Sequence, residues 1–192
     1  MQPPDATRQV DQFLEWLKPL QGDLETYCRR LLWNPQETPD ALHNTLLRAI
    51  AAFDRCHGQE VFRAWMFKIL THEALALNRK HARIARFEFQ IEPEELENLA
   101  AAETSHCWGH PEELTGWQQG LTDHLDLALK ALSESERAVL LLRAIGGFKY
   151  QEIAEELDMP VGSVMGYLAR ARKKMQATLR TKQQPKTSPK IL

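Results

Sequence analysis

The sequence is short of cysteine, of long apolar runs and of the alternating pattern that marks β-strands. Its three cysteines, Cys28, Cys56 and Cys107, form no CxxC pair, which argues against a disulfide framework and favours a reducing compartment. The start, MQPPDATRQV, has no apolar signal core, and no stretch approaches the roughly 18 apolar residues of a membrane span. We therefore expect an all-α, cytoplasmic protein without membrane insertion.

Motifs for catalysis and for stable metal binding are also missing. No nucleophile elbow, phosphate-binding loop or HExxH sequence occurs. His106, Cys107 and His110 lie close together in the chain, but no fourth ligand follows at a spacing suited to structural zinc. We expect no enzyme activity, no cofactor and no metal site.

Charge of one sign is absent from two long stretches. Residues 87–129 contain ten acidic residues and no Lys or Arg, whereas residues 159–192 contain eight Lys and Arg and no acid. Residues 29–86 carry ten basic residues against five acidic ones, so they are net basic. Basic segments favour nucleic acid as a partner. We predict a domain over 1–86, an acidic linker over 87–120, a second domain over 121–182 and a disordered tail over 183–192.

The second domain has the pattern of a helix-turn-helix. Ser133 followed by Glu136 is a capping box, and Gly146 with Gly147 ends the helix that it begins. A short helix is expected over 150–157, a tight turn over 158–160 and a third, reading helix over about 161–179. The inward stripe of the third helix consists of Val164, Leu168, Ala171 and Met175.

The first domain is predicted to contain amphipathic helices around a loop. One or two helices are expected over 7–33, and a helix over 39–53 should turn Leu42, Leu46, Ile50 and Phe53 inward and leave Leu47 exposed. Residues 54–60 lack an apolar period and contain a glycine, which indicates a loop. A helix with interleaved basic residues and Trp65 follows over about 61–86.

Two blocks of the sequence, in this order, resemble regions 2 and 4 of extracytoplasmic-function (group 4) sigma factors. They are TPDALHNTLLRAIAAFDRCHGQEVFRAWMFKILTHEALALNRKHAR and LSESERAVLLLRAIGGFKYQEIAEELDMPVGSVMGYLARARKKM. Such proteins are two-domain specificity subunits of bacterial RNA polymerase. The resemblance implies core RNA polymerase and promoter DNA as partners, with an anti-sigma factor as inhibitor.

The resemblance assigns the helix over 39–53 to core polymerase. The implied contacts are Asp40, Leu42, His43, Asn44, Leu47 and Arg48. The family commonly has glutamine and then an acidic residue where this chain has His43 and Asn44. Loss of a carboxylate removes a charge-assisted bond from such a surface.

The resemblance also assigns residues to the minus-ten element, where unstacked bases need pockets and phosphates need cations. The loop residues implied are Arg55, Cys56, His57, Gly58, Gln59 and Glu60. The following helix would flank the strand with Arg63, Lys68, His72, Asn78, Arg79 and Lys80, whereas Trp65 is expected to face the core.

At the minus-thirty-five element the implied contacts are Lys149, Tyr150, Ser163, Tyr167, Arg170, Lys173 and Lys174. Met165, Tyr167 and Ala169 stand where the family has lysine, arginine and histidine. We therefore expect this chain to bind the minus-thirty-five element more weakly and with fewer contacts from positively charged side chains.

Two other functions compete with a sigma factor. A sigma-like adaptor would sequester an anti-sigma factor without binding promoters, and His43, Asn44, Met165 and Tyr167 motivate it. A stand-alone helix-turn-helix regulator would use only the second domain and bind duplex DNA as a free dimer.

Overall fold

The computed structural model describes residues 5–89 and 124–181, and within them every regular element is a helix. The first group of helices comprises α1 (Asp5–Leu17), η1 (Lys18–Leu20), α2 (Gln21–Leu31), η2 (Pro35–Glu37), α3 (Thr38–Ala51), η3 (Phe53–Arg55) and α4 (Gln59–Phe89). The second group begins with a helix over 124–130 and continues with α7 (Glu134–Leu141), η4 (Leu142–Gly146), α8 (Tyr150–Glu156) and α9 (Val161–Thr181). The all-α prediction is confirmed over this part of the chain. Residues 87–89, which the prediction placed in the acidic linker, belong to α4 instead, and the rest of the predicted linker and the tail lie outside the described residues.

The core of the first group is aromatic. The Phe13 ring meets the rings of Phe53 and Phe62 edge to face, with centroids 5.3 and 5.5 Å apart, an arrangement that aromatic rings prefer. Tyr27 is fully buried, and its hydroxyl lies 2.8 Å from Thr71 Oγ1, which itself donates to the Phe67 carbonyl. Burial raises the pKa of Tyr27, so this phenol stays protonated and fills the role of donor.

Small side chains determine which face of α3 is buried. Ala41, Thr45 and Ala49 are buried, whereas Leu42 and Leu46 are half-buried against the core. Ile50 is 42% exposed, so its predicted inward position is wrong, while the predicted exposure of Leu47 is confirmed at 55%. These small side chains let α3 approach α4 closely, so the helix is rotated with them toward α4. The larger apolar side chains of α3 then lie at the edge of the contact.

The second group is a helix-turn-helix with its predicted boundaries close to the observed ones. Ser133 Oγ accepts from the Glu136 backbone N–H, and Glu136 Oε2 accepts from the Ser133 N–H, which completes the capping box. Gly147 ends the π-helical turn η4 at a φ of +75°, a left-handed conformation that suits glycine. Val164, Leu168 and Ala171 of α9 are buried and Met175 is half-buried, as predicted.

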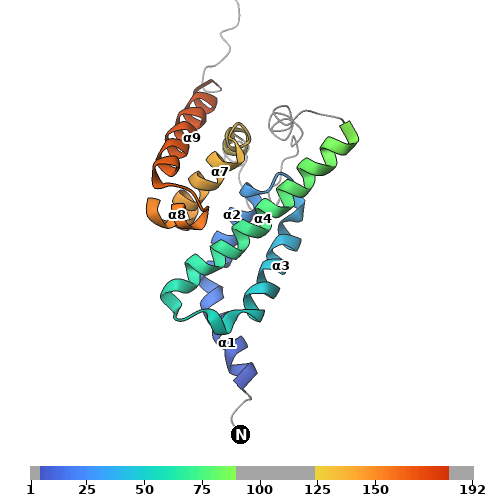
Figure 1. The fold of residues 1–192 in the computed structure, drawn as a ribbon, viewed down its shortest axis with the longest axis vertical. Coiled ribbons are helices and arrows are strands. Elements are labelled where there is room, and N and C mark those ends of the chain that lie inside the picture. The colour runs from blue at the N-terminus through green and yellow to red at the C-terminus, as the bar shows by residue number, and fades with distance from the viewer. Residues whose placement is uncertain (1–4, 90–123, 182–192) are drawn as a thin grey trace, which may run out of the picture.

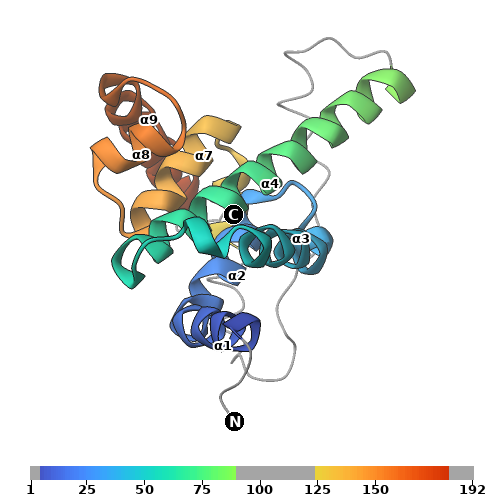
Figure 2. The same ribbon diagram turned by 60° about the horizontal axis from the view of Figure 1, so that its bottom comes forward.

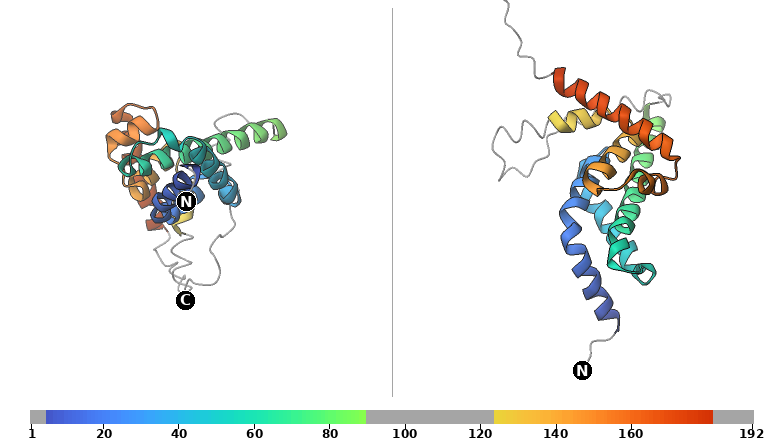
Figure 3. Two further views of the ribbon diagram at one scale, coloured as in Figure 1. Left: turned by 90° about the horizontal axis from the view of Figure 1, so that it is seen from below. Right: turned by 90° about the vertical axis from the view of Figure 1, so that its left-hand side faces the viewer.

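The two groups of helices pack against each other. Both α7 and η4 contact α2, and the rings of Phe67 and Phe148 meet edge to face with centroids 5.4 Å apart. Figures 1 and 2 show α7, α8 and α9 gathered beside the N-terminal half of α4, while the C-terminal half of α4 extends past them. In the right-hand view of Figure 3, α9 crosses the other helices at the end of the molecule away from the N-terminus.

Candidate nucleic-acid and partner interfaces

The outer face of α3 carries the residues that the resemblance assigns to polymerase. Asp40, His43, Asn44, Leu47 and Arg48 are exposed, and Leu42 is half-buried. Leu47 and Ile50 are 55% and 42% exposed and are three residues apart on the helix, which places two apolar side chains side by side. An apolar centre with a polar surround is the usual composition of a protein contact site.

A buried carboxylate lies directly beneath this face. Glu73 of α4 has 8% of its side chain exposed; it accepts from Asn44 Nδ2 at 3.1 Å and forms an ion pair with Arg48 Nη1 at 3.0 Å. The sequence interpretation missed Glu73. The signal that could have found it was an acid among the apolar and basic residues of α4, because a buried acid needs a partner on a neighbouring helix.

The segment between α3 and α4 exposes most of its predicted base-binding residues, although the loop is shorter than predicted because Arg55 ends η3 and Gln59 begins α4. Arg55, His57, Gly58 and Gln59 are exposed and Cys56 is half-buried. His57 Nδ1 lies 2.9 Å from the Arg55 carbonyl, and Gly58 has a φ of +105°, so the chain turns sharply here. Desolvation raises the pKa of the Cys56 thiol, so this cysteine is not activated as a nucleophile.

On α4 the predicted strand-binding residues fall into two sets. Lys68, His72, Arg79 and Lys80 are exposed. Arg63 instead faces the second group of helices, where Nε donates to the Gly146 carbonyl at 3.1 Å and Nη2 donates to the Ile145 carbonyl at 3.0 Å. Its Nη2 also pairs with Asp23 at 2.9 Å, and its guanidinium lies over the Phe67 ring. In this arrangement Arg63 caps the end of η4 and holds no phosphate.

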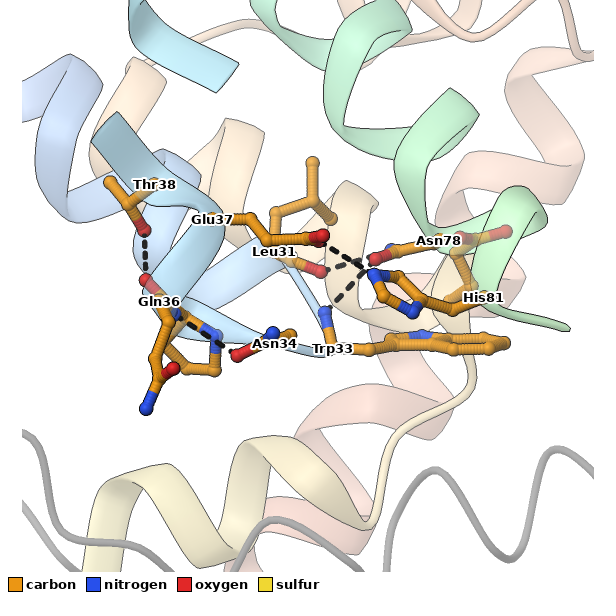
Figure 4. Close-up of polar contacts among 10 residues, drawn as sticks. Leu31, Trp33, Asn34, Gln36, Glu37, Thr38, Asn78 and His81 are labelled. Atoms are coloured by element: carbon orange, nitrogen blue, oxygen red, sulfur yellow. Dashed lines mark hydrogen bonds and ion pairs between the residues drawn. The ribbon is translucent and has the colours of Figure 1, made fainter. Parts of the chain in front are cut away.

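Asn78 is 1% exposed and also belongs to the contact between the two groups. Its Oδ1 accepts from the Trp33 N–H at 2.9 Å, and its Nδ2 donates to the Leu31 carbonyl and to Glu134 Oε1. Figure 4 shows this network beside the contact between His81 Nε2 and Glu37 Oε2, 2.7 Å long. Asn78 therefore stabilises the backbone after α2 and offers no atom to DNA in this arrangement.

Several of the α9 residues that the resemblance assigns to DNA are partly buried or contact other side chains of α9. Ser163 and Tyr167 are half-buried, and the Arg170 guanidinium lies over the Tyr167 ring, 4.7 Å from its centroid. Lys149 and Lys173 are exposed and Tyr150 is half-buried. The side chain of Met165, 50% exposed, is the largest apolar one on the outer surface of α9.

Two of the residues of α9 that the resemblance assigns to the minus-thirty-five element pair with a buried carboxylate. Glu136 has 3% of its side chain exposed and lies 2.7 Å from Lys174 Nζ and 3.5 Å from Arg170 Nε. Burial acts to raise the pKa of Glu136, but the hydrogen bonds from Lys174 and Ser133 and the two positive charges outweigh it, so the pKa lies below its usual range. These cations therefore have a structural partner before any DNA arrives.

A second carboxyl group lies where α8 meets the first group of helices. Glu156 is half-buried, and its Oε1 atom is buried with no hydrogen-bond partner among the described residues. Desolvation raises its pKa to about 7, against the opposing charge of Lys68 on α4. Besides burial, the charge of Glu156 contributes to the raised pKa of Tyr27 on α2.

Neither a membrane span nor a metal cluster occurs in residues 5–89 and 124–181. None of their helices is long and apolar enough to cross a bilayer. In the same part of the chain, no three His, Cys, Asp or Glu side chains gather as metal ligands would. The His106, Cys107 and His110 cluster lies outside the described residues.

Comparison with known proteins gives two family matches that together span both groups of helices. Residues 16–84 match Sigma-70 region 2, and residues 123–175 match Sigma-70, region 4.

Curated relatives are distant but similar over most of the chain. The ECF RNA polymerase sigma-E factor of Salmonella typhimurium is 26% identical over 140 residues, which cover 71% of this chain and 70% of that protein. The ECF RNA polymerase sigma factor SigG of Mycobacterium tuberculosis is 26% identical over 187 residues, 91% of this chain and 50% of that protein.

Solved structures show the same fold. The chain is similar to the sigma factor RpoE of Bartonella quintana, solved with the anti-sigma factor NepR, at a TM-score of 0.70 and 22% identity over 88% of this chain and 97% of that one. It is also similar to CnrH, solved with the cytosolic domain of CnrY, at a TM-score of 0.59 and 23% identity over 92% and 95% of the two chains.

Proposed function

The chain belongs to the extracytoplasmic-function sigma factors, and we propose that it binds core RNA polymerase in the cytoplasm and directs it to a specific set of promoters. The observation that carries this proposal is the ordered pair of family matches, region 2 over 16–84 and region 4 over 123–175. Sigma factors are transcription initiation factors, and we assign this chain no reaction of its own. A lone helix-turn-helix would support only DNA binding.

The proposal divides the work between domains over 1–86 and 121–182. The exposed face of α3 binds polymerase through Leu47 and the polar residues around it. The loop at 55–60 receives an unstacked base of the non-template strand, and the exposed cations Lys68, Arg79 and Lys80 hold its phosphates. The helix α9 enters the major groove of the minus-thirty-five element with Ser163 and Tyr167 toward the bases.

Regulation by an anti-sigma factor is part of the proposal. RpoE and CnrH, the two structural relatives, were each solved with a partner, the anti-sigma factor NepR and the cytosolic domain of CnrY. The contact between the two groups of helices, with Arg63 bound to the carbonyls of η4, supports an inactive state in which part of α4 is unavailable to DNA. We propose that an inhibitory partner acts on such a state.

Transcription from defined components tests the proposed function. The purified chain is added to core polymerase with fragments of the genome that encodes it, and transcripts are mapped by their 5′ ends. We expect initiation at promoters that share minus-ten and minus-thirty-five sequences, and none with core polymerase alone. Failure of the chain to bind core polymerase at micromolar concentration would rule out the proposed function.

The sigma-like adaptor remains a second candidate, favoured by the pairing of Arg170 and Lys174 with Glu136, which draws two cations away from DNA. Affinity purification of the chain from cells separates the two functions. A sigma factor recovers polymerase, whereas an adaptor recovers an anti-sigma factor and no polymerase.

A further inference from the structure

Glu73 is not among the predicted site residues, but it contacts two residues of the predicted polymerase contact on α3. It lies on α4, under the exposed face of α3, and its two carboxylate oxygens bind different residues of that face: Oε1 binds Asn44 at 3.1 Å and Oε2 binds Arg48 at 3.0 Å. Position 44 is one where the family commonly has an acidic residue. In this chain the carboxylate belongs to the buried residue Glu73 of α4, and position 44 at the surface carries the amide of Asn44.

The exposures of the two charged partners argue against a role in stability alone. Glu73 has 8% of its side chain exposed, whereas Arg48 has 65% exposed. An ion pair with a guanidinium this exposed contributes little to folding, because water screens the attraction. Burying a carboxylate has a desolvation penalty that such a pair offsets poorly. The pair between buried Glu73 and exposed Arg48 is therefore better suited to holding the Arg48 side chain in one orientation than to stabilising the fold.

The remaining hydrogen-bond donors of Arg48 are available to a partner. A guanidinium has five N–H donors in a rigid plane and no acceptor, and among the described residues Arg48 forms an ion pair with Glu73 through one nitrogen, Nη1. Fixing that nitrogen restricts the long side chain beside Leu47 before binding, so less rotamer entropy is lost on association. The opposing surface that fits has a carboxylate facing Arg48 and an apolar side chain facing Leu47.

We propose that Glu73 is a positioning residue: it holds Arg48 and Asn44 on the α3 face so that Arg48 presents its free donors to a carboxylate on core RNA polymerase. This inference rests on the proposed function for the identity of the partner. It adds a residue that contacts no polymerase itself and acts through the two side chains that it binds.

Exchange of charge between positions 44 and 73 gives a matched set of variants. In Glu73→Gln the negative charge that attracts Arg48 is lost, and the neutral amide oxygen holds a guanidinium less strongly than a carboxylate does. In the double variant Asn44→Asp with Glu73→Gln, the amide donates to the new carboxylate at 44 and its oxygen accepts from Arg48. The net charge equals that of the wild type, and the bonding pattern is reversed rather than lost.

The first measurement needs no polymerase. NMR relaxation of the Arg48 Nε–H group in the full chain should show a high order parameter in the wild type, a clearly lower one in Glu73→Gln and a restored one in the double variant. An unchanged order parameter in Glu73→Gln would overturn the positioning role, whether or not the chain binds polymerase.

The second measurement is the Kd for core polymerase, taken well below the unfolding temperature of each variant. We expect Glu73→Gln to weaken binding about tenfold, which corresponds to about 1.4 kcal/mol, and the double variant to recover most of it. In an Arg48→Ala background, Glu73→Gln should have an effect of less than about twofold, because residues that act together are not additive. Additive losses would overturn the proposal. Absence of binding by the wild type would instead remove the proposed function and leave the first measurement to decide the role of Glu73.

Discussion

Glu73 under α3 and Glu136 under α9 are both buried carboxylates that bind exposed cations, yet their surroundings differ. Glu136 also completes the capping box with Ser133 and binds two cations of the same domain. Among the described residues, Glu73 makes no helix cap and binds only side chains of the α3 face. An acid built into a helix start contributes to folding, whereas an acid that binds only surface groups mainly orders that surface.

The largest expected effect is on folding. Glu136→Ala removes the capping box and two ion pairs with exposed cations, so we expect the second domain to lose about 2 to 3 kcal/mol of unfolding free energy. Urea unfolding followed by circular dichroism measures this loss. Glu155→Ala, on the exposed side of α8, is the control and should change the unfolding free energy by less than about 0.5 kcal/mol. Equal effects of the two variants would contradict the structural role of Glu136.

The next effect concerns binding at α3. Leu47→Asp places a charge in the apolar centre of the predicted polymerase contact, and we expect a loss of about 2 kcal/mol, or roughly thirtyfold in Kd, with little change in unfolding temperature. Leu14→Asp on α1 is a matched control, because Leu14 is 50% exposed against 55% for Leu47. If Leu14→Asp weakens polymerase binding as much as Leu47→Asp does, the α3 face is not the contact.

The pH dependence should distinguish Glu156 from Glu136. The pKa of Glu156 is raised from 4.5 to about 7 in the fold, so its contribution to stability is fully present below about pH 4.5 and is lost as the pH rises through 7. The pKa of Glu136 is lowered, so its contribution is present above the usual carboxyl pKa and is lost in acid. Unfolding temperatures measured from pH 5 to 8 should fall in the wild type and fall less steeply in Glu156→Gln. Identical slopes would show that Glu156 does not ionise in this range.

The smallest effect tests which cations of α9 are available to DNA. Lys173 is exposed, whereas Lys174 binds Glu136. In filter-binding assays of the polymerase complex on promoter DNA, Lys173→Ala should reduce the slope of log K against log salt by about 1, and Lys174→Ala should reduce it less. Equal changes in slope would indicate that Lys174 leaves Glu136 when DNA binds.

Local sequence patterns determined most of the secondary structure. The capping box at Ser133, the left-handed glycine at position 147 and the apolar stripe of α9 act within one or two turns of helix, so their signals can be read along the chain. The inward position predicted for Ile50 was wrong. The spacing of large apolar residues does not show that the small residues Ala41, Thr45 and Ala49 form the face that packs on α4. Rotation of a helix depends on the side chains of its neighbour.

Only some residues of the candidate interfaces could be predicted from the sequence. The exposed residues of α3 and of the loop at 55–60 follow from their own helix and turn. The places of Arg63 and Asn78 do not, because the partners in the second group of helices are at least 56 residues away in the chain: Gly146 and Ile145 for Arg63, and Glu134 for Asn78. A basic or amide side chain on a basic helix looks like a nucleic-acid contact until a distant segment covers it.

By itself the sequence determined that residues 5–89 and 124–181 form helices, that residues 29–86 and 159–192 are net basic, and that its two blocks follow the order of sigma regions 2 and 4. Those properties depend on periodicity, capping and composition, which are local. The tertiary structure alone decided that Glu73 and Glu136 are buried beneath surface cations and that the second domain covers part of α4. Burial and charge pairing depend on which side chains distant segments bring within a few ångströms, and no spacing along the chain records that distance.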